Sequence, residues 1–216
     1  MKVAAVIFDL DGTVLDDEGL YGIAFKKVLE SLGAKVEGDH PHVSGIGVKE
    51  NWPGLLKKYH IITNKSYEEL AKETQDIYIA DLNKVSVTEG FEDFVEGLRE
   101  AGIQTALATS NIWMIVEDVF HKFGLESYFD CITTGDEVRS KKPEPDLFLY
   151  TAGKLGVQKD DCLVIEDAPS GIEAAISAGM KVVGLYRTDA QKKELENANL
   201  LVKDFTEISP ETLLNL

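Results

Sequence analysis

Two carboxylates, Asp9 and Asp11, stand directly after a run of six apolar residues at positions 3–8. The run is rich in Val, Ile and Ala, which is typical of a strand buried on both faces of a sheet. A glycine and a threonine follow at positions 12 and 13, so the chain can turn sharply there and offer a hydroxyl group. In open α/β sheets, ligands bind just outside the carboxyl ends of the strands, where we expect these two acids. The alternative is an ordinary strand that ends in an acidic turn.

Polar side chains also follow two later apolar runs. The run at residues 104–108 is followed by Thr109, Ser110 and Asn111, and the run at 162–165 is followed by Glu166 and Asp167. The hydroxyl, amide and backbone N–H groups after the first of these runs, at the start of a predicted helix, can cradle an anion. If all three runs are parallel strands, their polar groups share one edge of the sheet.

A lysine in the segment 140–146 adds a positive charge. Lys142 lies in a turn fixed by prolines at positions 143 and 145, and Lys141 beside it is the alternative cation. Four carboxylates in one cleft repel one another, by up to about 4 kcal/mol for a pair in contact at an effective dielectric constant near 20. A divalent cation relieves this repulsion, and carboxylate oxygens with water suit Mg²⁺, which is the predicted cofactor. Together, Mg²⁺ and Lys142 allow the site to accept a phosphate.

These groups predict phosphoryl transfer, which asks for positioning and charge neutralisation more than for covalent chemistry. Asp9, at the tip of the strand, is the expected nucleophile and would form an aspartyl-phosphate. Asp11 is expected to protonate the leaving oxygen and then to deprotonate the attacking water. The predicted phosphate-binding set is Thr109, Ser110, Asn111 and Lys142, and the predicted metal-binding set is Asp9, Asp11, Glu166 and Asp167.

The elements that must position these groups alternate along the chain. The sequence predicts strands at residues 3–8, 104–108, 130–133, 162–165 and 181–185, with helices between the later ones. This alternation implies right-handed crossovers and a parallel sheet, so the predicted fold class is α/β with a Rossmann-like core. Residues 16–82 contain no strand pattern and predict helices only, one of them started by Ser66 and Glu69 as a capping box. We therefore expect a catalytic core from residues 1–15 and 83–216, with a helical cap domain at 16–82.

The composition limits the partners and the compartment. The chain has 216 residues, 44% hydrophobic and 28% charged, as expected of a globular protein with a sizeable core. Its net charge of −16 argues against nucleic acid and anionic membranes as partners, because phosphate groups attract Lys and Arg. The two cysteines, Cys131 and Cys162, indicate no disulfide framework. Since the sequence has neither a signal-like start nor a long apolar run, we expect a cytoplasmic protein. The oligomeric state is left open by the sequence, with a monomer as the default expectation.

Four ordered motifs resemble those of the haloacid dehalogenase-like (HAD) hydrolase superfamily, in the branch of β-phosphoglucomutase and phosphoglycolate phosphatase. They are Phe8-Asp9-Leu10-Asp11-Gly12-Thr13, Ala108-Thr109-Ser110-Asn111, Lys142-Pro143-Glu144-Pro145-Asp146, and Ile165-Glu166-Asp167 followed by Gly171-Ile172 and Ala178-Gly179-Met180. The resemblance spans essentially the whole chain and implies a Rossmann-like core, a mobile helical cap, an Asp nucleophile and Mg²⁺. It further implies that the backbone carbonyl of Asp11 binds the metal and that Lys142 is the functional lysine. Because the branch that cleaves carbon–halogen bonds lacks the second Asp, the resemblance favours phosphate chemistry.

Two departures from the mutase pattern favour hydrolysis over isomerisation. Near Tyr21 the mutases carry a proton-transferring His, and where their cap has a Gly-x-Ser-Arg loop for the distal phosphate, this chain has Gly45-Ile46-Gly47-Val48 and then Lys49. The predicted protein is a Mg²⁺-dependent phosphatase of a small phosphomonoester, such as a sugar phosphate. A sugar-phosphate mutase and a non-catalytic binder of a phosphorylated ligand are the alternatives. Substrate specificity is expected from Asp16, Tyr21, Gly45, Lys49 and Trp52, although Trp52 fits packing between cap helices equally well.

Overall fold

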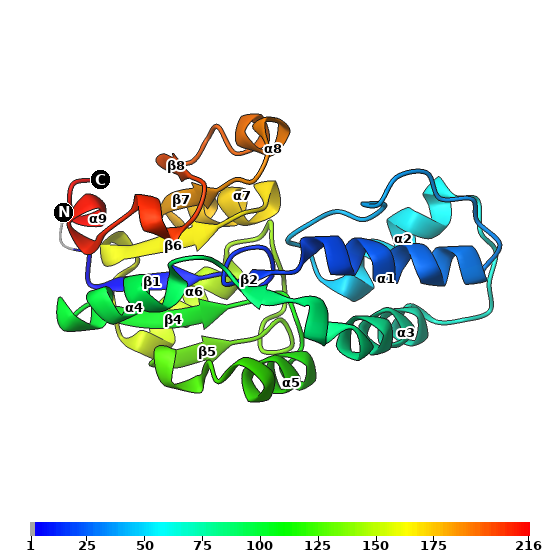
Figure 1. Ribbon diagram of the computed structural model, residues 1–216, viewed down its shortest axis with the longest axis horizontal. Helices are drawn as coiled ribbons and strands as arrows, with labels where there is room; N and C mark the ends of the chain where they lie inside the picture. The colour runs from blue at the N-terminus through cyan, green and yellow to red at the C-terminus, as the bar shows by residue number, and fades with distance from the viewer. Residues whose placement is uncertain (1–2) are drawn as a thin grey trace.

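The computed structural model of this chain describes residues 3–216. Its centre is a parallel sheet with the strand order β5-β4-β1-β6-β7-β8 (Figure 1). Its strands are β1 (Ala5–Phe8), β4 (Gln104–Ala108), β5 (Cys131–Thr133), β6 (Cys162–Glu166), β7 (Lys181–Leu185) and β8 (Leu200–Val202). The predicted parallel α/β core is confirmed. The edge strand β8 is an addition to the prediction, since its short pairing with β7 leaves only a weak sequence pattern.

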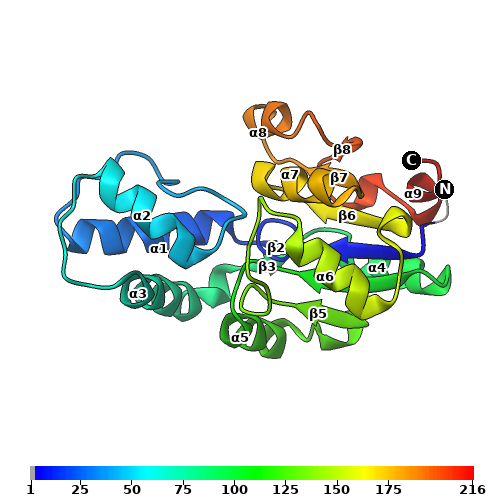
Figure 2. The ribbon, with the colours of Figure 1, turned by 180° about the vertical axis from the view of Figure 1, so that it is seen from behind.

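Helices cover both faces of this sheet (Figures 1 and 2). The helices of this core are α4 (Phe91–Glu100), α5 (Trp113–Phe123), α6 (Asp146–Leu155), α7 (Pro169–Ala178), α8 (Asp189–Glu194) and α9 (Pro210–Leu214), of which α9 packs against α4. Among the described residues, no helix is both long enough and apolar enough to cross a membrane. Both cysteines are free thiols, which agrees with the absence of a disulfide framework.

Strand β1 lies in the middle of the sheet and is buried on both faces, as its apolar run predicts. Val6 and Phe8 belong to one hydrophobic cluster, which includes residues of α4 and α5, whereas Ala5 and Ile7 belong to a second cluster with residues of α6 and α7. Alternate side chains of a strand point to opposite faces, so both clusters hold β1 in place. The residue that follows, Asp9, therefore starts from a fixed base.

Three helices lie beyond the carboxyl ends of the strands (Figure 1). They are α1 (Glu18–Ser31), α2 (Val48–Lys58) and α3 (Tyr67–Ala80), and we call residues 18–80 the three-helix insert. Helix α3 packs against both α1 and α2. The capping box predicted at its start is confirmed, because Ser66 Oγ accepts from the N–H of Glu69 and the Glu69 carboxylate accepts from the N–H of Ser66.

A short antiparallel ribbon connects the three-helix insert to the core. It pairs β2 (Leu15–Asp16) with β3 (Ser86–Val87). The division of the chain into domains at 16–82 and the remainder stays a prediction, and the ribbon lies next to both of its boundaries.

Candidate active site

The carboxyl ends of three neighbouring strands bring the predicted polar groups together. Strand β1 pairs with β4 on one side and with β6 on the other, so that Phe8 lies beside Leu107 and Ile165. The polar residues at this edge are Asp9, Asp11, Thr13, Thr109, Ser110, Asn111, Glu166 and Asp167. All of them are buried except Asp11, which is half-buried.

Lys142 reaches the same edge and is itself completely buried. Its ammonium group donates to Oδ1 of Asp9, to Oε1 of Glu166 over 2.7 Å and to the carbonyl oxygen of Ala108 over 3.2 Å. Burial alone would lower the pKa of Lys142, but the charges of Asp9 and Glu166 raise it above its usual range. The neighbouring Lys141 lies outside the cluster and pairs with Glu50 over 3.2 Å.

The pKa of the Asp9 carboxyl group is also shifted, in the direction that favours its neutral form. Burial raises its pKa well above the usual range, and the nearby charges of Glu166 and Asp11 raise it further, while Lys142 opposes both effects. One ammonium group therefore does not balance the acids at this edge, and a further cation would favour the charged form of Asp9.

Three of the buried acids are placed to hold a metal ion. Asp9, Glu166 and Asp167 each offer a carboxylate oxygen, and these oxygens lie within 4.8 Å of one another. An all-oxygen donor set fits Mg²⁺. In this structure both oxygens of Glu166 have partners, since Oε1 accepts from Lys142 and Oε2 accepts from the N–H groups of Asp167 and Ala168 over 2.9 and 2.8 Å.

Two glycines leave room for these carboxylates. A Cβ atom on Gly12 would lie 2.1 Å from Oδ2 of Asp167, and one on Gly171 would lie 1.8 Å from Oε1 of Glu166. Gly12 also has a φ angle of +79°, which favours glycine. The acids are thus packed directly against backbone, which fixes where their oxygens point.

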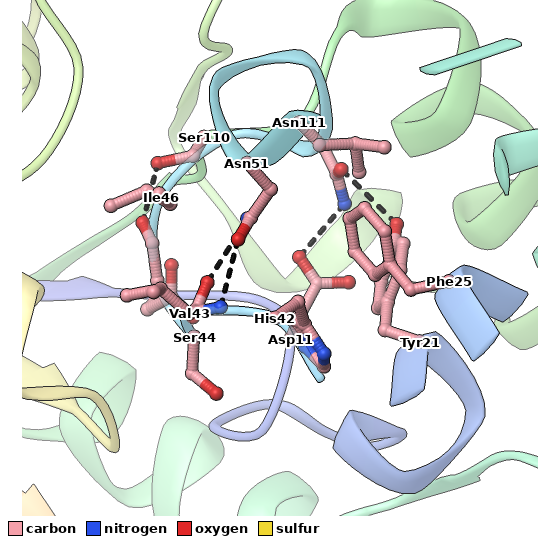
Figure 3. Close-up of a pocket in the computed structure, with 13 residues that line it drawn as sticks. Asp11, Tyr21, Phe25, His42, Val43, Ser44, Ile46, Asn51, Ser110 and Asn111 are labelled. Carbon is pink, nitrogen blue, oxygen red and sulfur yellow. Dashed lines mark hydrogen bonds between the residues drawn. The ribbon is translucent and has the colours of Figure 1, made fainter. Parts of the chain in front are cut away.

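A pocket lies between this edge of the sheet and the three-helix insert (Figure 3). The core contributes Asp9, Asp11, Ser110 and Asn111, and the insert contributes Tyr21, Phe25, His42, Val43, Ser44, Gly45, Ile46, Val48 and Asn51. Among the described residues that line it, none is a lysine or an arginine.

Two of the five residues expected to determine substrate specificity, Tyr21 and Gly45, line this pocket, and the structure does not bring the other three there. Asp16 pairs with Nε of Arg187 over 3.2 Å, and Lys49 pairs with Glu68 over 2.6 Å. Trp52 is fully buried, and the centroid of its ring lies 5.6 Å from that of Phe25. Asp16 and Lys49 thus bind other charged residues and Trp52 packs inside the insert, and substrate contacts by these three residues stay predictions.

Two of the expected phosphate-binding side chains are engaged elsewhere. The hydroxyl of Ser110 donates to the carbonyl oxygen of Gly45 over 2.8 Å, which joins the core to the insert. The amide of Asn111 donates to Asp11 and accepts from Tyr21. Thr109 stays at the strand end, where its Oγ1 accepts from the N–H of Asn111 over 3.1 Å.

Phe25 and His42 line the pocket although neither is predicted from the sequence to do so, whereas Asn51 lies in the segment 43–52, which is expected from the sequence to contribute to specificity. Phe25 follows Tyr21 by one helical turn, and this spacing could have indicated a shared face of α1. His42 stacks on Phe25 with ring centroids 4.8 Å apart. Asn51 fixes the loop at Val43. Its Oδ1 accepts from the N–H of Val43 over 2.8 Å, and its Nδ2 donates to the carbonyl oxygen of Val43 over 3.1 Å. No local pattern marks His42 as a pocket residue.

Comparisons with known proteins agree on one family. A family model described as haloacid dehalogenase-like hydrolase matches residues 6–185. A phosphorylated carbohydrates phosphatase of Thermotoga maritima is 31% identical over 215 residues, covering 98% of this chain and 97% of the relative. A β-phosphoglucomutase of Bacillus subtilis is 29% identical over 219 residues, covering 97% and 93%. The crystal structure of β-phosphoglucomutase from Clostridium difficile superposes with a TM-score of 0.88 at 24% identity, covering 99% of this chain and 96% of that one.

Proposed function

The chain belongs to the haloacid dehalogenase-like hydrolase family, and we propose that it is a Mg²⁺-dependent phosphatase of a small phosphomonoester. The observation that carries the proposal is the buried cluster in which Asp9 lies against Lys142 and beside Glu166 and Asp167. A nucleophilic carboxylate, a fixed ammonium group and a set of oxygen ligands are what phosphoryl transfer requires. The name of the Thermotoga maritima relative supports a phosphorylated carbohydrate as substrate.

In the first step, an oxygen of Asp9 attacks phosphorus while the bond to the leaving oxygen breaks, which yields an aspartyl-phosphate. Asp11 gives its proton to the leaving oxygen as that bond breaks. In the second step, Asp11 takes a proton from water, and the water oxygen attacks the phosphorus of the aspartyl-phosphate while the bond between phosphorus and the Asp9 oxygen breaks. The products are inorganic phosphate and the regenerated carboxylate of Asp9.

The remaining groups balance and hold charge. Lys142, which pairs with Asp9, would also bind the transferring oxygens, and Thr109 would bind them from the end of β4. Asp9, Asp167 and the backbone carbonyl of Asp11 would hold Mg²⁺, with Glu166 as a further carboxylate of the cluster. When bound, the ion supplies positive charge that offsets the acids and the phosphate.

The walls of the pocket favour hydrolysis over isomerisation. A mutase that handles a bisphosphate needs a cationic group for the second phosphate, and the described lining residues include no lysine or arginine. The similarity to the Bacillus subtilis β-phosphoglucomutase keeps the mutase as the second candidate. Conversion of β-glucose 1-phosphate to glucose 6-phosphate without net release of phosphate would favour it.

A panel of sugar, nucleotide and short-acid phosphates, assayed with Mg²⁺ and with EDTA, tests the proposal. We expect phosphate release from some of these esters with Mg²⁺ and none with EDTA. No phosphate release from any ester of the panel, together with a negative mutase assay, would favour a non-catalytic binder of a phosphorylated ligand. The expectations of a monomer and of a cytoplasmic location stay predictions.

A further inference from the structure

A chain of two hydrogen bonds runs from the three-helix insert to Asp11. The hydroxyl of Tyr21, on α1, donates to Oδ1 of Asn111 over 3.1 Å, and Nδ2 of Asn111 donates to Oδ2 of Asp11 over 2.8 Å. Figure 3 shows both bonds at the wall of the pocket. Tyr21 and Asn111 are both buried, with 4% and 5% of their surface exposed.

The core fixes the backbone of Asn111. Its N–H donates to Oγ1 of Thr109 over 3.1 Å, and its carbonyl oxygen accepts from the N–H of Gly135 over 2.7 Å. The side-chain amide can still adopt two orientations related by half a turn, and only one of them presents the NH₂ group to a carboxylate. A hydroxyl that donates from the other side selects that orientation, because it requires the amide oxygen to face it.

The ring of Tyr21 is itself held in place. It stacks on Tyr78 with ring centroids 4.1 Å apart and an angle of 12° between the planes. The hydroxyl of Tyr78 donates to Oδ2 of Asp17 over 2.5 Å, and Oδ1 of Asp17 accepts from the N–H of Gly12 over 2.9 Å. Burial and the charge of Asp17 raise the pKa of Tyr78 well above its usual range, so the phenol remains a donor.

We propose that Tyr21 is a positioning residue, which acts through Asn111 to fix the orientation of the Asp11 carboxylate. This inference rests on the proposed function, in which Asp11 exchanges protons with the leaving group and with water. Tyr21 belongs to the insert and Asn111 to the core, so the acid–base group is fully oriented only when the insert is seated on the core. In this structure it is seated, and Ser110 and Ser170 of the core donate to the carbonyl oxygens of Gly45 and Ser44.

Two substrates with different leaving groups distinguish a loss of Asp11 positioning from a general disturbance of the site. An alkyl phosphate needs a proton on its departing oxygen, whereas acetyl phosphate releases acetate, which needs none. The ratio kcat/KM reports the steps up to the aspartyl-phosphate for both substrates. For Tyr21→Phe, which keeps the ring stack, we expect kcat/KM to fall about 3- to 10-fold for the best alkyl phosphate of the panel and less than about 2-fold for acetyl phosphate, as expected for the loss of one hydrogen bond.

Two reference variants complete the test. Tyr150→Phe removes a hydroxyl from an exposed side chain on α6 and should leave kcat/KM unchanged for both substrates. Asp11→Asn should show the same selective loss as Tyr21→Phe but larger, and Tyr21→Phe should add no further selectivity in the Asp11→Asn background.

The outcomes separate the inference from the proposed function. An equal loss on both substrates in Tyr21→Phe, or no loss on either, overturns the positioning role. If Asp11→Asn is selective and Tyr21→Phe is not, the inference alone fails. If Asp11→Asn loses both activities equally, or the natural protein hydrolyses neither substrate, the proposed role of Asp11 fails and the inference fails with it.

Discussion

The ammonium group of Lys142 lies 2.7 Å from Oε1 of Glu166, and neither side chain has any exposed surface. Asp9, which follows β1, also pairs with this ammonium group. A charge pair of this kind is costly to bury and is more costly to break, because the charge that remains has no water around it. The arrangement therefore ties the stability of the core to the groups proposed for catalysis.

Replacing Lys142 by methionine should leave Asp9 and Glu166 buried without their shared cation. We expect the free energy of unfolding in EDTA, measured by urea denaturation, to fall by about 3–5 kcal/mol. The matched control is Lys141→Met, whose partner Glu50 has a side chain that is 39% exposed, and which should lose less than about 1 kcal/mol. Equal losses in the two variants would contradict the geometry described for Lys142.

Replacing Asp9 by asparagine should abolish turnover and leave the fold intact. The amide oxygen can still accept from Lys142, and the repulsion with Glu166 and Asp11 is relieved, so we expect the free energy of unfolding in EDTA to change by less than about 1.5 kcal/mol. Phosphate release should fall by at least about 1000-fold, as expected for loss of a nucleophile. Turnover that survives in a correctly folded Asp9→Asn protein would remove Asp9 from that role.

Mg²⁺ should stabilise the folded protein in the absence of any substrate. A ligand at ten times its dissociation constant adds about 1.4 kcal/mol to the free energy of unfolding, which thermal denaturation detects as a rise in Tm. Asp167→Asn should lose most of this rise, because Asp167 belongs to the buried oxygen cluster. Asp160→Asn, at an exposed position before β6, should keep it. A rise that is the same in both variants would place the ion elsewhere.

A pair of helical glycines tests the close packing around Glu166. A Cβ atom on Gly171, in α7, would lie 1.8 Å from Oε1 of Glu166, whereas one on Gly153, in α6, would meet no atom within 4 Å. Gly171→Ala should therefore lose about 1–3 kcal/mol of unfolding free energy through overpacking. Gly153→Ala should gain about 0.5–1 kcal/mol, since alanine favours a helix interior over glycine. Equal stability of Gly171→Ala and Gly153→Ala would contradict the close approach of the Gly171 backbone to Glu166.

The sequence by itself determined the parallel sheet and the family, because both rest on local patterns. The apolar run before Asp9 is buried on both faces, and the polar residues after β1, β4 and β6 meet because the carboxyl ends of parallel strands share one edge. The pairing of Ser66 with Glu69 in the capping box also spans a single helical turn.

Only the tertiary structure decided which further side chains of the insert reach the core. Phe25 and His42 line the pocket beside the expected Tyr21, while Lys49, a cation near the expected substrate loop, pairs with Glu68. These contacts depend on how three helices pack on one another and how the insert sits on the sheet, and neither is encoded in a local pattern. The same holds for Asn111, whose amide bonds a partner from the insert and one from the first motif, across a distance in sequence that no periodicity spans. Side-chain contacts between distant segments follow from packing, and packing is settled only when the whole chain is folded.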